Sequence, residues 1–316
     1  MIKDLKLDKN RSSFSKEMQK NWRLYSLAIP ALLFLGVFHY WPMFGLVLAF
    51  KDFNFKLGIF GSDWANPLFT NFELLVSSKY ALNAVKNTLL LNFLFILVGT
   101  VCALTLAIML NEIKSNVYKK ITQSVTFLPF FISWIVVGMF LTSILSYDNG
   151  ILNQFLETLD KEKIQFYQQP KYWPVILTIE SVWKGVGYNS IVYLAAITGL
   201  NPAYYEAAEI DGATQIQKIT RITIPLLKPT IIILTLLALG RIMNSDFGLF
   251  WQSTKGIYSL WPTTDVIDTF IYRGLRQTVN IGLSSAAGFF QSIISLMIVV
   301  SFNWLARKVD SDSALY

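Results

Sequence analysis

The chain has 316 residues, of which 53% are hydrophobic and only 15% are charged, and its formal net charge is +7. An ordinary soluble domain has about 25% charged residues, so this composition excludes a typical soluble globular protein. With one cysteine, Cys102, and one histidine, His39, the sequence also excludes an internal disulfide and a Cys/His zinc cluster.

Apolar segments long enough to cross a bilayer recur along the chain. Four of them, 24–50, 88–110, 124–147 and 281–306, contain no charged residue. Two more, 173–200 and 229–250, carry a few charges but are otherwise apolar. We therefore predict an all-α integral membrane protein with six transmembrane helices, because a membrane β-barrel would show short alternating segments instead. The predicted membrane domain is 24–306, between tails at 1–23 and 307–316.

The charged residues inside the predicted spans 173–200 and 229–250 need a partner or water, because an isolated charge within a membrane is costly. Glu180 and Lys184 are four residues apart, so on a helix they share a face, and we predict that they can pair. Arg241 and Asp246 lie in the fifth predicted span, where a structural charge pair between them is one interpretation and a place for Asp246 on a substrate path is another.

The distribution of Lys and Arg predicts the orientation. With both termini in the cytoplasm, the inner segments 1–23, 111–123, 201–228 and 307–316 hold 15 Lys and Arg against nine acidic residues. The rest of the chain holds 12 against 11, which agrees with the positive-inside rule. The net charge is thus a signal of topology, and we do not expect nucleic-acid binding because no basic run is interleaved with aromatics.

Three outer loops are predicted at 51–83, 148–172 and 251–280, and they are rich in Trp, Tyr, Phe and Asn. Such residues suit contact with an external partner. Packing at the headgroup level explains the same composition, because Trp and Tyr favour the membrane interface.

The loop 201–228 is much longer than the other inner connection and carries the signals of two helices. Asn201 is a good N-cap and Pro202 suits the first turn of a helix that we expect over 203–210. Asp211 and Gly212 end that helix, and a second helix is expected from 213 to 220. The loop is therefore predicted to be a helix-turn-helix docking element.

The same loop resembles the signature loop of permease subunits in binding-protein-dependent ABC importers. That pattern is EAA, three residues, G, nine residues, I, one residue, LP. Here it reads Glu206-Ala207-Ala208, Gly212, Ile222 and Ile224-Pro225, with Ile224 in place of Leu as the only departure. The resemblance implies a permease fold whose loop couples to an ATPase. The coupling residues that it suggests are Glu206, Ala207, Ala208, Glu209, Asp211, Gly212, Ile222 and Pro225.

Other segments narrow the resemblance to the branch of permeases that import oligosaccharides cut from polysaccharides. These segments are 40–45, 49–53, 61–64, 71–72 and 265–275. The chain itself has no GxxxxGK[ST] loop and no glycine-rich turn after a strand, so ATP and Mg²⁺ are expected on other subunits and no cofactor on this one.

The resemblance implies a multi-subunit importer in a bacterial plasma membrane. Its partners would be a second permease, two ATP-binding cassette subunits, a lipid-anchored extracytoplasmic solute-binding protein and an oligosaccharide. No catalytic or metal-binding residue is expected in this chain.

Sugars bind through hydroxyl hydrogen bonds and aromatic faces, so polar and aromatic residues in the spans are candidates for the substrate pathway. Helix packing is the alternative for each of them, because Asn and Gln also join transmembrane helices by hydrogen bonds. The candidates are Trp183, Tyr188, Asn189, Tyr193, Asn244, Asp246 and Gln291.

Two other classes of protein compete with the importer subunit. A self-contained secondary transporter or channel for a polar solute would commonly show an internal repeat and charged sites at mid-membrane. A membrane-embedded enzyme would need a nucleophile and base or a metal site, and no HExxH or GxSxG motif is present.

Overall fold

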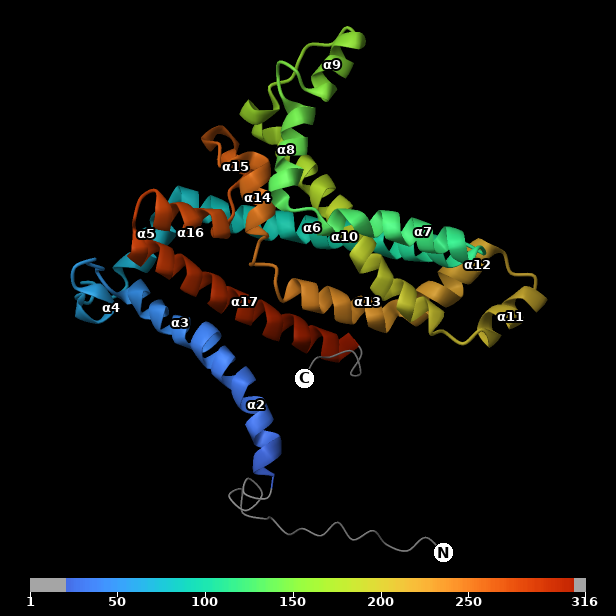
Figure 1. Ribbon diagram of the computed structural model, residues 1–316, viewed down its shortest axis with the longest axis horizontal. Coiled ribbons are helices and arrows are strands. Elements are labelled where there is room, and N and C mark those ends of the chain that lie inside the picture. The colour runs from blue at the N-terminus through green and yellow to red at the C-terminus, as the bar shows by residue number, and fades with distance from the viewer. Residues whose placement is uncertain (1–20, 310–316) are drawn as a thin grey trace, which may run out of the picture.

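The computed structural model describes residues 21–309, and within that range every regular element is helical (Figure 1). Most of the two predicted tails lies outside the described residues. The N-terminal arm consists of α2 (Trp22–Leu35), η1 (Gly36–Tyr40), α3 (Trp41–Met43) and η2 (Phe44–Phe50). Two short helices follow, α4 (Gly58–Gly61) and α5 (Thr70–Ser77).

The central part of the chain contains the longest helices. It runs through α6 (Lys79–Glu112), α7 (Asn116–Phe127), η3 (Leu128–Phe131), α8 (Trp134–Leu145), α9 (Ile151–Thr158), η4 (Phe166–Gln168), η5 (Pro170–Tyr172) and α10 (Trp173–Thr198). The C-terminal part comprises α11 (Ala203–Ile210), α12 (Gln215–Lys218), η6 (Ile219–Thr223), α13 (Ile224–Leu239), α14 (Phe247–Thr254), η7 (Tyr258–Leu260), α15 (Trp261–Thr264), α16 (Ile267–Arg276) and α17 (Ile281–Val309).

Four helical runs in the described chain are long and apolar enough to cross a membrane. They are Trp22–Phe50, Lys79–Glu112, Gln215–Leu239 and Ile281–Trp304. A fifth is obtained if the bent pair Asn116–Phe131 and Trp134–Leu145 counts as one span. The helix α10, predicted as the fourth span, has 26 residues but is less apolar and is not among these runs. Six spans therefore remain a prediction.

Two predicted spans are not single helices. The segment 124–147 bends by 95° between η3 and α8. Pro129 lies in the tight turn of η3, and Ser133 is extended and caps α8 through a hydrogen bond from the Val136 N–H, so the backbone changes direction there. The segment 229–250 contains the end of α13, a non-helical stretch after Gly240, and the start of α14.

The body of the molecule is built around α6, which packs along α10. Small side chains of α6, Ala103 and Ala107, are fully buried against Tyr193, Leu194 and Ile197 of α10. Small residues let two helix backbones approach closely where no polar pairing draws them together. This contact holds α10 against α6, and α10 also contacts α13.

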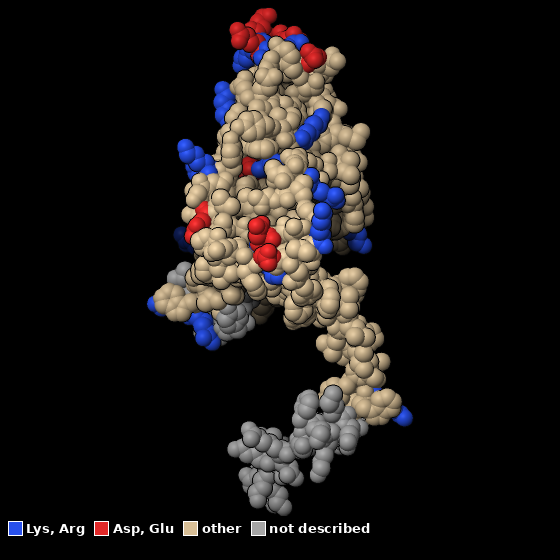
Figure 2. Space-filling model, turned by 90° about the vertical axis from the view of Figure 1, so that its left-hand side faces the viewer, with Lys and Arg blue, Asp and Glu red and all other residues tan. Residues whose placement is uncertain are grey.

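The N-terminal arm extends away from this body (Figure 1). The helix α2 has no buried residue, and its apolar side chains, such as Leu27 at 77% exposed, contact little of the chain. Figure 2 shows the arm as almost uncharged surface, whereas acidic and basic side chains are scattered over the body and cluster at its far end. An apolar helix of this length is a surface for lipid or for another subunit.

Candidate functional site

The connection between α10 and α13 contains the first helix predicted from the sequence, α11, and the turn after it. The second predicted helix, 213–220, is not a separate element, because it begins at Gln215 and continues through η6 and α13 to Leu239 as one helical run. The Asn201 Oδ1 accepts a hydrogen bond from the Ala203 N–H at 3.0 Å, which starts α11 as expected for an N-cap. At the other end, Gly212 has a φ of +75°. Its N–H donates to the Glu209 carbonyl at 3.0 Å, and the Ala213 N–H donates to the Ala208 carbonyl at 2.9 Å. This is a Schellman motif, in which glycine takes the left-handed position that a Cβ disfavours.

Side-chain contacts fix α11 and α12 relative to the long helices. The Tyr205 and Thr223 hydroxyls are 2.9 Å apart, which joins α11 to the helix that continues into α13. The Gln215 Nε2 donates to the Glu112 Oε2 at the end of α6 at 2.6 Å. The loop is therefore braced against two of the long helices and is not a free tether.

An ion pair closes the turn between the two short helices. The Lys218 Nζ donates to the Glu209 Oε1 at 2.7 Å. The hydrogen bond and the positive charge of Lys218 hold the pKa of the Glu209 carboxyl below its ordinary value. Glu209 is therefore ionised at neutral pH and already has a partner within the chain.

The outer surface of this element is exposed. The helix α11 has no buried residue. Most of the residues that the signature pattern suggests are exposed, and only two, Ala208 and Ile222, are half-buried. The exposed ones are Glu206, Ala207, Glu209, Asp211, Gly212 and Pro225. Three apolar side chains also project from the element. They are Tyr204 at 54%, Ile210 at 87% and Ile216 at 74% exposed.

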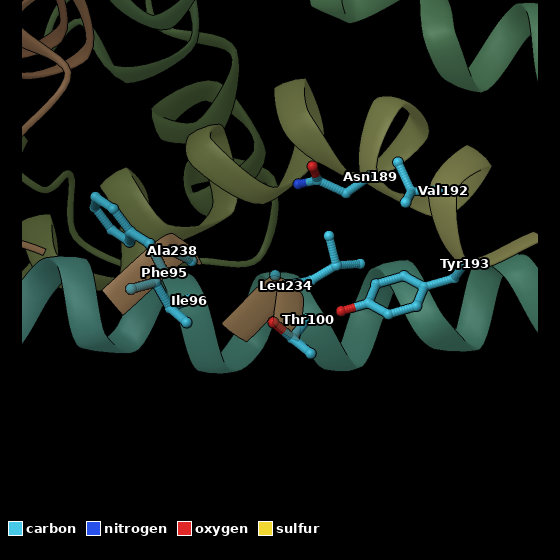
Figure 3. Close-up of a pocket in the computed structure, with 9 residues that line it drawn as sticks. Phe95, Ile96, Thr100, Asn189, Val192, Tyr193, Leu234 and Ala238 are labelled. Atoms are coloured by element: carbon cyan, nitrogen blue, oxygen red, sulfur yellow. The ribbon is translucent and has the colours of Figure 1, made fainter. Parts of the chain in front are cut away.

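Two adjoining cavities lie between α6, α10 and α13. The first, of about 150 Å³, is lined by Asn189 and Tyr193 of α10 and by Phe95 and Thr100 of α6, among others (Figure 3). In Figure 3 the Tyr193 hydroxyl points toward Thr100. The second cavity, of about 250 Å³, shares Phe95, Ile96 and Ala238 with the first and reaches the break between α13 and α14.

The break between α13 and α14 exposes backbone groups that side chains from other helices satisfy. The Asn92 Nδ2 donates to the Ile242 carbonyl at 2.7 Å, and the Gln291 Nε2 donates to the Met243 carbonyl at 2.7 Å. The Ser245 N–H donates to the Asp268 Oδ2 at 2.8 Å. Such breaks at membrane depth are tolerated where the backbone is buried in protein or lines a cavity.

The predicted pathway residues fall into three groups. Asn189 and Tyr193 line the first cavity, and Asn244 and Asp246 line the second. Gln291 is 7% exposed and lies in neither lining, because its amide is bonded to the break. Trp183 and Tyr188 are 42% and 48% exposed and lie outside both linings; Tyr188 stacks on Phe130 with ring centroids 4.8 Å apart.

Neither predicted charge pair forms in the described part of the chain. Glu180 is 6% exposed, and the Lys184 Nζ donates instead to the carbonyls of Pro129, Phe130 and Ile132. The Asp246 carboxylate accepts from the Trp134 Nε1 at 2.7 Å and caps α14, so it makes no ion pair with Arg241. The i, i+4 spacing places Glu180 and Lys184 on the same face of α10, but backbone carbonyls at the bend before α8 accept the hydrogen bonds of Lys184 instead.

Comparison with known proteins settles the class of this molecule. Residues 83–312 match the family described as the binding-protein-dependent transport system inner membrane component. This chain belongs to that family. It is a permease component of a transport system and not an enzyme, and membership of the family favours an importer subunit over a self-contained secondary transporter.

Similar permeases match over nearly their full length. The chain is 31% identical over 301 residues to "Protein LplB" of Bacillus subtilis, which covers 95% of this chain and 93% of that protein. It is also 31% identical over 313 residues to the B. subtilis protein described as "Polygalacturonan/rhamnogalacturonan transport system permease protein YteP", which covers 97% and 94%.

A solved structure shares the fold. It is described as a bacterial alginate ABC transporter in complex with an alginate pentasaccharide-bound periplasmic protein. One of its chains superposes with a TM-score of 0.84 at 36% identity, which covers 94% of this permease and 98% of that chain.

Proposed function

We propose that this permease forms, together with a second permease chain, the path by which an oligosaccharide crosses a bacterial plasma membrane. An extracytoplasmic binding protein, expected to be lipid-anchored, delivers the sugar, and two separate ATP-binding cassette subunits with ATP and Mg²⁺ supply the energy. The observation that carries the proposal is the helix α11, which is exposed and fixed to two long helices, because a self-contained transporter has no use for such an element.

The loop 201–228, which we call the coupling loop, has the properties of a docking element. Its exposed residues Tyr204, Ile210 and Ile216 offer apolar surface that another protein can cover. Hydrogen bonds join the loop to α6 and to the helix that leads into α13, so a displacement of α11 would be transmitted to the membrane domain. Glu206 and Asp211 are exposed and have no ion-pair partner among the described residues, so they are available to donors of an ATPase surface.

The two adjoining cavities suit a carbohydrate. Their linings combine the aromatic rings of Phe95, Trp134 and Tyr193 with the amides of Asn189 and Asn244. Aromatic faces and hydrogen-bonding side chains are the groups that a sugar requires. An oligosaccharide substrate is also supported by the similar proteins, whose descriptions name polygalacturonan/rhamnogalacturonan and alginate.

The arrangement of the helices supports the proposed topology of six spans with both termini in the cytoplasm. In Figure 1, α11, α12 and the end of α17 lie toward the right and the bottom, whereas α4, α5, α15 and α9 lie toward the left and the top. The first group would face the cytoplasm and the second the binding protein. A pocket of about 500 Å³ lined by Tyr80, Tyr258 and Trp261 lies in this second group.

The test is to purify the tagged chain from its native membrane in mild detergent and to identify stoichiometric companions by mass spectrometry. We expect a second permease with an EAA loop and an ATPase with a GxxxxGK[ST] loop. A Glu206→Lys variant serves as the matched control, since it should insert normally and lose the ATPase selectively. Recovery of the wild-type chain alone, in several detergents and after crosslinking, would refute the proposal.

A further inference from the structure

The larger of the two adjoining cavities is lined by an exposed charged side chain, Arg241, that has no side-chain partner among residues 21–309. This cavity of about 250 Å³ lies where α13 breaks, and its polar lining comes from four parts of the chain. That polar lining comprises Asn92, Trp134, Ser181, Arg241, Asn244 and Asp246. Arg241 lies two residues beyond the end of α13.

The other charges at this cavity are already satisfied. The Asp246 carboxylate accepts from the Trp134 Nε1 through one oxygen and from the backbone N–H groups of Gly248 and Leu249 through the other. The Lys184 ammonium, which lies 5.1 Å from the Trp134 ring, donates to backbone carbonyls at the bend before α8. Neither group is left to neutralise Arg241.

The Arg241 guanidinium makes no hydrogen bond and no ion pair within the described residues. A charged group in a membrane domain is costly, and such groups are retained where they face a watery cavity and serve a substrate or ion. Neutral sugar hydroxyls would be served by amides and hydroxyl groups alone. A permanent positive charge with a planar fork of donors instead matches a carboxylate, which it can bind through two parallel hydrogen bonds.

We propose that this cavity binds an acidic sugar unit of the transported oligosaccharide, and that Arg241 selects it by pairing with its carboxylate. The proposal rests on the proposed function and names the substrate class as oligouronates. Arg241 is then the residue that distinguishes acidic from neutral sugars inside the permease, downstream of any selection by the binding protein. The aromatic ring of Phe95, shared by the two cavities, lies beside the route of the neighbouring unit.

The experiment uses the purified complex with its partner subunits in lipid nanodiscs and without the binding protein. The probes are trigalacturonate and its fully methyl-esterified form, which has the same length and linkage but no charge. Dissociation constants are measured by isothermal titration calorimetry. We expect the wild-type complex to bind the acid at least about tenfold more tightly than the ester, because hydrogen bonds between charged groups are worth that much or more.

Variants assign the preference to one side chain. Arg241→Gln should weaken binding of the acid by about tenfold and leave the ester unchanged, whereas Arg241→Lys should retain part of the preference. Arg276→Gln is the matched control, because Arg276 is also exposed and without an ion pair but lines none of the cavities described here. Loss of the acid preference in Arg241→Gln alone supports the proposal.

Several outcomes would overturn it. These are equal affinities for acid and ester, no binding of the acid, an unchanged Arg241→Gln variant, or competition by glycerol 3-phosphate that exceeds competition by the uronate. The Arg241→Lys variant keeps the test decisive if Arg241→Gln fails to assemble. A failure of the proposed function is distinguishable from these outcomes, because the ATPase and the second permease would then be absent from the purified sample before any binding is measured.

Discussion

Replacement of Gly212 tests whether the ordered turn after α11 is needed for transport. Gly212 has a φ of +75°, and a Cβ built there would meet nothing within 4 Å. Substitution by Ala is therefore free of steric clash and costs only the strain of a left-handed backbone, about 1–2 kcal/mol. That cost shifts the balance from the closed Schellman turn toward a frayed helix end by about 5- to 30-fold.

The series Gly212→Asn, Gly212→Ala and Gly212→Val orders the strain. Asn tolerates the left-handed region, Ala less so, and the β-branched Val least. ATP-driven uptake by proteoliposomes, normalised to the amount of inserted chain, should fall in that order while the ATPase activity in the absence of substrate persists. Wild-type uptake by the Val variant, or equal losses in the Asn and Val variants, would refute the proposal that the geometry of this turn is needed for coupling.

Three further predictions concern packing, ionisation and a buried ion pair. Gly187→Ala should lower the free energy of unfolding in detergent by at least about 2 kcal/mol, because the added Cβ would lie 2.0 Å from a backbone oxygen of α7. Gly185→Ala is the control and should keep the wild-type stability, because the nearest atom to its Cβ would be 3.6 Å away. Thermal unfolding of the two variants checks this difference. The Lys218 contact that lowers the pKa of Glu209 stabilises α11 at neutral pH and is lost as the pH falls through that lowered pKa. Protection of the α11 amides, measured as hydrogen exchange relative to the intrinsic rate at each pH, should therefore fall in acid for the wild type and stay unchanged for Glu209→Gln. Asp265→Ala should destabilise the protein by about 3–5 kcal/mol, because it leaves Arg273 buried and unpaired after loss of a bidentate contact at 2.6 Å; a smaller loss in the double variant Asp265→Ala/Arg273→Met than in the single one checks this reasoning.

The coupling loop was predictable because its structure depends on local signals. Asn201 caps α11, Gly212 takes the left-handed position that ends it, and the helix bounds of 203–210 agree with the prediction. Each of these residues acts through backbone atoms only a few positions away. A sequence contains that information without any knowledge of the tertiary fold.

The bend before α8 was missed because hydropathy counts charges and ignores backbone direction. Residues 124–147 are uncharged throughout, so they resemble one span, yet Pro129 and Ser133 mark the change of direction within it. The expected pair of Glu180 and Lys184 failed for another reason. The end of η3, far away in the sequence, presents free carbonyls to Lys184, and no local pattern reveals that competition.

The sequence alone does not show which candidate pathway residues line a cavity and which join helices by hydrogen bonds. Asn189 and Gln291 are both amides in apolar helices, but Asn189 lines a cavity while Gln291 donates to a carbonyl at the break in the fifth span. The difference depends on where α13 ends, which is decided by packing among α6, α16 and α17. Arg241 was visible in the sequence, but the sequence did not show that its guanidinium has no partner among the described residues.

The helical run from Gln215 to Leu239 has 25 residues and a length of about 37 Å, and it begins at the exposed loop and ends two residues before Arg241. One helical run thus connects the proposed docking surface with the break at which the proposed selective charge lies. By thermodynamic linkage, any nucleotide state that alters the affinity of the cavity must itself be favoured or disfavoured by cargo to the same extent. An oligosaccharide that fits the cavity would then report its presence to the proposed ATPase, so the membrane subunit as well as the proposed binding protein would limit ATP hydrolysis in the absence of cargo.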